Sequence, residues 1–105
     1  MIRKGFLIQA QPGMEKEYER RHNPIWPELD AIMRAHGVLN FTTFLHEPTN
    51  QMFCYVEIED EDKFNAMAKE PVCQRWWKYM TEALVCEAPD ADKGKEESLR
   101  EIFHM

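Results

Sequence analysis

The sequence has few cysteines, few glycines and no long hydrophobic run, and each shortage argues against a class of protein. Its three cysteines, Cys54, Cys73 and Cys86, are odd in number and form no C-x-x-C pair, so we expect free thiols in a reducing cytoplasm. The four glycines are too scattered for a glycine-rich nucleotide-binding loop. No apolar stretch approaches the ~20 residues of a transmembrane helix. The apolar run Phe6–Ile8 is too short for the core of a signal peptide.

Positive charge is also in short supply. Lysine and arginine number 13 against 19 acidic residues, which gives a net charge of −6, and the basic residues are scattered along the chain. Nucleic-acid binding needs a basic footprint, so we expect no nucleic-acid partner. No two histidines stand at H-x-H or H-x-x-x-H spacing, which argues against a metal site. The sequence therefore predicts a protein that works without a metal or another cofactor.

What the chain has in quantity is apolar bulk. Of its 105 residues 44% are hydrophobic, including six Phe, three Tyr, three Trp and seven Met. The length fits one domain over residues 1–105. A domain of this size leaves much of its surface exposed, and this one carries more apolar bulk than a single-layer domain needs. We therefore expect a second subunit to cover part of it.

Apolar periodicity predicts an alternation of strands and helices. A strand is expected over residues 2–10, followed by a helical stripe from Met14 that Pro24 and Pro27 interrupt. Because residues before proline avoid the helical region, the break should fall near Asn23, with Asn23 as the new cap. Gly37 should end the second helical piece.

The rest of the chain completes a β-α-β-β-α-β order. It predicts strands over 38–46 and 52–59, a helix that starts near 60–62 and breaks or restarts at Pro71, and a last strand over 98–105. This order is that of a ferredoxin-like α+β sandwich.

The two middle strands are apolar on both faces. Strict alternation places Leu39, Phe41 and Leu45 on one face of the first strand, and Val38 and Phe44 on the other. An antiparallel sheet with one wet face would alternate more cleanly between apolar and polar residues. We therefore expect helices on one face and another subunit on the other.

Tyr18 and His22 are the first candidates for chemistry. They stand four residues apart on the predicted helix, so their side chains share one helix face. An unperturbed histidine pKa near 6.5 suits proton transfer at neutral pH, and the helix end should favour the protonated form of His22. The same spacing also fits two residues that only pack in the core.

Trp76 and Trp77 form the second candidate group. Adjacent residues on a helix point about 100° apart, so one ring should face the core more than its neighbour. Tryptophan rings can bind the apolar face of a sugar. Spacing equally fits one core tryptophan beside a half-exposed one, and it does not decide between these interpretations.

Two long motifs resemble the L-rhamnose mutarotase family. They are EYERRHNPIWPEL over residues 17–29 and VCQRWWKYM over residues 72–80, and the MIRK start and His36-Gly37 fit as well. The resemblance covers essentially the whole chain. It implies a cytosolic homodimer of ferredoxin-like subunits, without a cofactor. The implied activity is that of an isomerase that interconverts the α and β anomers of L-rhamnose.

The resemblance also implies residue roles. The family's proton donor falls on His22, and its substrate contacts fall on Tyr18, Trp76 and Trp77. A further substrate contact in the family is a tyrosine where this chain has Phe41, so one hydroxyl is missing here. The departure bears on affinity and sugar preference more than on the type of reaction. The general base is unassigned, and a water or a carboxylate brought near by folding could serve.

Two other classes of function stay open at this point. One is a cofactor-free monooxygenase of the dimeric α/β-barrel type acting on an aromatic substrate, which would consume oxygen. The other is a non-catalytic sugar-binding module, which would bind sugars without changing the rate of anomer exchange.

Overall fold

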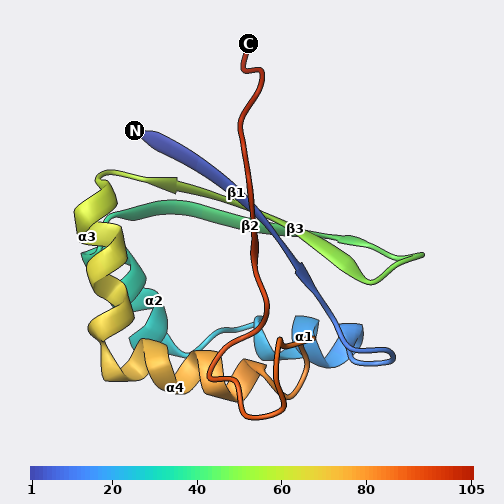
Figure 1. Ribbon diagram of the computed structural model, residues 1–105. Coiled ribbons are helices and arrows are strands. Elements are labelled where there is room, and N and C mark those ends of the chain that lie inside the picture. Colours follow the sequence, from blue (N-terminus) through green and yellow to red (C-terminus); the bar gives the residue numbers. More distant parts are fainter.

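The computed structural model describes residues 1–105 as an antiparallel sheet with helices against one face (Figure 1). The strands are β1 (Ile2–Gln9), β2 (Val38–His46), β3 (Gln51–Ile58) and β4 (Glu97–Leu99), in the order β2-β3-β1-β4. The helices are α1 (Glu15–Arg21), α2 (Pro27–Ala35), α3 (Glu61–Asn65), the 3-10 turn η1 (Ala66–Lys69) and α4 (Pro71–Met80). This is the ferredoxin-like arrangement, and the predicted α+β class is confirmed.

The core lies between the helices and one face of the sheet. In the β1–β3 pair, Phe6 lies opposite Cys54 and Ile8 lies opposite Met52. Residues directly opposite each other in an antiparallel pair share a face, and this face packs against Trp76 of α4. Burial of these apolar side chains is what holds the helices on the sheet.

A β-bulge changes the predicted faces of β2. Strict alternation placed Val38 on the face opposite Phe41, and that prediction is wrong. Val38 pairs with Ile58 and Phe41 pairs with Val56, so both point toward the helices. The register shifts between Val38 and Asn40, because one extra residue in the strand resets the alternation.

The opposite face of the sheet is not covered by this chain. It carries Leu7, Phe44, Phe53 and Leu99, and the Phe44 side chain is 65% exposed. The two apolar faces that the sequence predicted are present, but the helices cover only one of them.

The break between the first two helices differs in detail from the prediction. Asn23 was expected to cap the second helix, but Trp26 holds the N-cap position and Pro27 begins α2. The Asn23 side-chain amide instead donates to the carbonyl of Glu19 at 2.7 Å, which satisfies an acceptor at the end of α1. Gly37 follows α2 with φ of 82°, as the prediction of a glycine stop required.

The last strand is much shorter than predicted. Residues 98–105 were expected to form it, but β4 covers only Glu97–Leu99, which pairs with Gly5 to Leu7 of β1. Beyond it the chain leaves the sheet, as Figure 1 shows, with Ile102 and Phe103 exposed. The three cysteines are free, as predicted. No helix has the length and apolar character needed to cross a membrane.

Candidate active site

A groove runs between the helix-facing side of the sheet and helices α1, α2 and α4. It has a volume of about 1340 Å³. All five residues predicted for the site line it, namely Tyr18, His22, Phe41, Trp76 and Trp77. The fold therefore brings together residues from α1, β2 and α4 that lie far apart in the sequence.

The end of α1 orients the His22 ring. His22 is the C-cap residue of α1, and its Nδ1 lies 2.8 Å from the carbonyl oxygen of Tyr18. A carbonyl oxygen only accepts, so Nδ1 carries the hydrogen. In the neutral ring Nε2 then holds the free lone pair, and no protein group hydrogen-bonds to it. His22 can therefore exchange a proton with a ligand through Nε2.

Burial decides the protonation of His22. Desolvation lowers its pKa from the ordinary 6.5, and the hydrogen bond to the Tyr18 carbonyl only partly offsets this effect. The carbonyl at the helix end does favour the protonated form, as expected, but the loss of hydration outweighs it and the net pKa is lowered. A lowered pKa makes the imidazolium a stronger proton donor.

Tyr18 supports the imidazole with its ring rather than with its hydroxyl. The two rings stack with their centroids 4.1 Å apart and an interplanar angle of 26°. Burial holds the Tyr18 pKa well above its usual range, so the phenol stays protonated at every physiological pH. Thr43 of β2 lies close enough to the phenol to influence its pKa. Tyr18 thus spans the groove from α1 to the sheet.

The tryptophan doublet divides as predicted into a buried and a half-exposed ring. Trp76 is 7% exposed and meets the His22 ring edge-on at 5.1 Å, while Trp77 is half-buried. Trp76 also packs edge-on against Trp26 at 5.0 Å. Trp76 therefore packs against the imidazole, and Trp77 keeps a partly exposed ring at the groove.

Phe41 lies on the sheet wall of the groove. It packs edge-on against Phe6, with ring centroids 6.0 Å apart, and its side chain is 42% exposed. This wall offers apolar surface but no hydroxyl at this position.

Arg21 joins α1 to the end of α4 and thereby sets the distance between His22 and Trp76. Its guanidinium donates to Glu17 at 2.6 Å and to the carbonyl of Tyr79 at 2.8 Å, and it pairs with Glu82 at 2.9 Å. It also lies 4.0 Å from the centroid of the Tyr79 ring. These contacts involve a side chain that is almost fully buried.

The structure adds groove residues that sequence reasoning missed. Thr43, Lys93 and Glu96 also line the groove, and Thr43 Oγ1 lies 3.5 Å from Cys54 Sγ. No local spacing connects them to His22, because each reaches the groove through the tertiary fold. No three side chains of the types His, Cys, Asp and Glu come together as a metal site.

Comparison with known proteins identifies the family of this chain. The family model for L-rhamnose mutarotase matches residues 3–105. The chain belongs to the L-rhamnose mutarotase family. A curated L-rhamnose mutarotase from Shigella flexneri is 47% identical over 105 residues, covering 100% of this chain and 99% of that protein. The family resemblance drawn from the two sequence motifs is confirmed.

Solved structures agree on the fold. A crystal structure of an L-rhamnose mutarotase from Formosa agariphila matches with a TM-score of 0.87 at 24% identity, covering 100% of this chain and 99% of that one. A dimeric ferredoxin-like protein from an uncultured marine organism matches with a TM-score of 0.58 at 6% identity, covering 98% and 96%. Because both structures are less than 25% identical to this chain, these similarities support its fold alone.

Replacing Arg21 by Met should loosen the join between α1 and α4. The change keeps much of the apolar stem but removes the charge-assisted hydrogen bonds, so we expect the free energy of unfolding to fall by about 1.5–3 kcal/mol. Arg20→Met is the matched control, because Arg20 pairs with the same Glu17 from an exposed position and should change stability little. Urea denaturation at one protein concentration measures both variants. Equal losses would contradict the role given to Arg21.

Proposed function

We propose that this protein is an isomerase that interconverts the α and β anomers of L-rhamnose. The observation that carries the proposal is the His22 ring, which is fixed through Nδ1 and presents a free Nε2 to an aromatic-walled groove. Membership of the L-rhamnose mutarotase family supports the choice of sugar. The catalytic unit is the single domain of residues 1–105.

The reaction needs only proton transfers. The protonated His22 gives a proton from Nε2 to the ring oxygen, while a base removes the proton of the anomeric hydroxyl. The bond between the anomeric carbon and the ring oxygen then breaks and leaves a free aldehyde. The carbonyl carbon rotates, the same hydroxyl attacks its other face, and both protons return. General acid–base catalysis of this kind typically accelerates a reaction by about 10²–10⁴-fold.

The groove walls suit a sugar with apolar and polar faces. The half-buried Trp77 ring, beside Trp76, offers a flat apolar surface to the C–H face of the ring. Tyr18 and Thr43 place hydroxyl groups on the other side of the groove. Phe41 adds apolar surface that suits the methyl group of a 6-deoxy sugar.

The protein acts as a homodimer in the cytoplasm. A second copy would cover the open sheet face that carries Phe44 and Phe53, because an exposed apolar patch of this kind favours association. The dimeric state of a protein with the same fold supports this assembly. The free thiols Cys54, Cys73 and Cys86 fit a reducing compartment.

Replacing His22 by Ala should abolish the acceleration of anomer exchange while the fold survives. Saturation-transfer NMR on L-rhamnose measures the exchange rate, and His104→Ala, in the exposed tail, is the control.

In the wild type, kcat/KM should fall as pH rises through the His22 pKa, which burial places below 6.5, because the proton donor is then lost. Unchanged exchange in His22→Ala would remove His22 from the mechanism. A rate that rises with pH would make it the base instead.

The same assay separates the other classes of function. A monooxygenase would consume oxygen in the presence of an aromatic substrate and leave sugar anomers unaffected. A sugar-binding module would perturb sugar signals without changing the exchange rate. Neither outcome is expected.

Replacing Phe41 by Tyr should lower KM for L-rhamnose several-fold. Phe41 lines the groove, so the added hydroxyl can hydrogen-bond to the sugar, and one such bond contributes about 0.5–1.5 kcal/mol. Phe103→Tyr, in the exposed tail, is the matched control. Exchange rates over a range of sugar concentrations give KM, and an unchanged value would show that the groove does not use a hydroxyl at this position.

Replacing Phe44 by Glu should dissociate the dimer. The change places an unpaired charge on the face that we assign to the second copy, and burying such a charge is strongly unfavourable. Sedimentation velocity should show monomers at concentrations where the wild type is dimeric. Asp62→Lys, on the exposed side of α3, is the control for a change in charge. A dimeric Phe44→Glu variant would exclude this face as the interface.

A further inference from the structure

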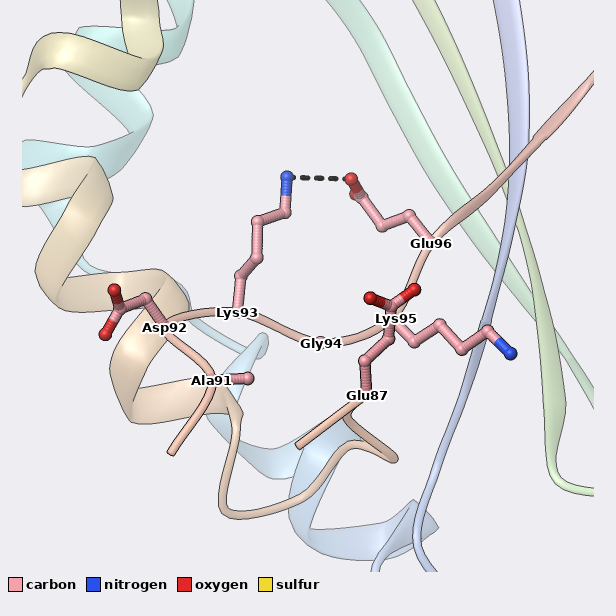
Figure 2. Close-up of a pocket in the computed structure, with 7 residues that line it drawn as sticks. All are labelled: Glu87, Ala91, Asp92, Lys93, Gly94, Lys95 and Glu96. Carbon is pink, nitrogen blue, oxygen red and sulfur yellow. Dashed lines mark ion pairs between the residues drawn. The ribbon is translucent and has the colours of Figure 1, made fainter. Parts of the chain in front are cut away.

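An ion pair on the loop before β4 borders the groove near Trp77. Lys93 Nζ lies 2.7 Å from Glu96 Oε1, and both residues line the groove that holds His22. Figure 2 shows the two side chains reaching toward each other on one side of the loop, whereas Lys95 and Glu87 lie on its other side. Figure 2 draws a hollow of the loop itself that these two residues also line. Since both residues line the groove of His22 as well, a ligand in that groove can reach them.

The loop is held firmly in place. The Lys95 N–H donates to the carbonyl of Val85 at 3.0 Å, and Lys78 Nζ donates to the carbonyl of Ala91 at 3.1 Å. Gly94 is buried so closely on Leu84 that a Cβ there would lie 2.6 Å from Leu84 Cδ1. These contacts fix the backbone of the loop, while the Lys93 and Glu96 side chains are 43% and 40% exposed and so can be reached by a ligand.

The two charges face different walls of the groove. Lys93 Nζ lies 4.5 Å from the centroid of the Trp77 ring. The Glu96 carboxylate is near enough to Tyr18 and Cys54 for its negative charge to raise the pKa of both groups. The pair thus lies between the helix-side tryptophan and the sheet-side polar atoms.

We propose that Glu96 and Lys93 bind hydroxyl groups of the sugar and so determine which sugars the groove accepts. A carboxylate accepts hydrogen bonds from two neighbouring hydroxyls, and an ammonium donates to a hydroxyl oxygen. Charge-assisted bonds of this kind are stronger than neutral ones. Lys93 and Glu96 also offer polar contacts to the sugar, whereas Phe41 has no hydroxyl to offer one. This inference rests on the proposed mutarotase function.

The test compares this pair with its neighbour on the same loop. Glu96→Gln removes the charge that binds hydroxyls, and we expect KM for L-rhamnose to rise about tenfold with kcat changed less than about twofold. Lys93→Met should raise KM in the same direction. The matched controls are Glu97→Gln and Lys95→Met, because Lys95 and Glu97 form a comparable pair, at 4.0 Å, that does not line the groove.

A series of monodeoxy sugars identifies the hydroxyls that are bound. With the wild type, a deoxy sugar that lacks a bound hydroxyl should have a higher KM than L-rhamnose. With Glu96→Gln, the same deoxy sugar should have nearly the same KM as L-rhamnose. If the loop had only a structural role, Glu96→Gln would change the thermal midpoint of unfolding and kcat instead of KM. Equal KM in the Glu96→Gln and Glu97→Gln variants, with an active wild type, would overturn this inference alone. A wild type that accelerates no exchange would overturn the proposed function itself.

Discussion

The groove depends on the place where α1 ends. The helix stops at Arg21 after about two turns, which leaves His22 at its C-terminus with the Tyr18 carbonyl free to accept from Nδ1. Arg21 then joins this end to the carbonyl of Tyr79, at the last turn of α4. One arginine thereby holds the imidazole against Trp76. If α1 continued for another turn, the Tyr18 carbonyl would accept a backbone N–H instead of the His22 ring.

Burial serves the chemistry of His22 in two opposing ways. Removing water lowers the pKa of the imidazole, which makes its protonated form a stronger acid but also a rarer one. A charged group packed against the ring would change this balance, and the groups that contact it are the aromatic rings of Tyr18 and Trp76. The acidic and basic side chains of Glu96 and Lys93 lie instead in the loop at the groove's border. In the proposed mechanism this arrangement would keep His22 a strong proton donor and would leave polar side chains to bind the sugar.

The sequence predicts the parts of the site that depend on local periodicity and leaves out those that depend on tertiary contacts. Helical spacing placed Tyr18 and His22 on one face, and the 100° step between adjacent residues separated Trp76 from Trp77. Nothing in the local pattern marked Glu96, which reaches the groove only because its loop is fixed on Val85. The bulge in β2 was missed for a related reason, because register is set by the pairing with β3 and not by alternation within one strand.

In the proposed homodimer, the two faces of the sheet would separate assembly from chemistry. Successive residues of a strand point to opposite faces, so Phe6 of β1 lines the groove while its neighbour Leu7 lies on the open face. The same holds in β2, where Phe41 faces the groove and Phe44 the open side. A second copy on the open face would stiffen the strands that form the groove floor. Dimerisation would then act on the reaction through the backbone of the sheet, by holding Thr43 and Phe41 at a fixed distance from His22.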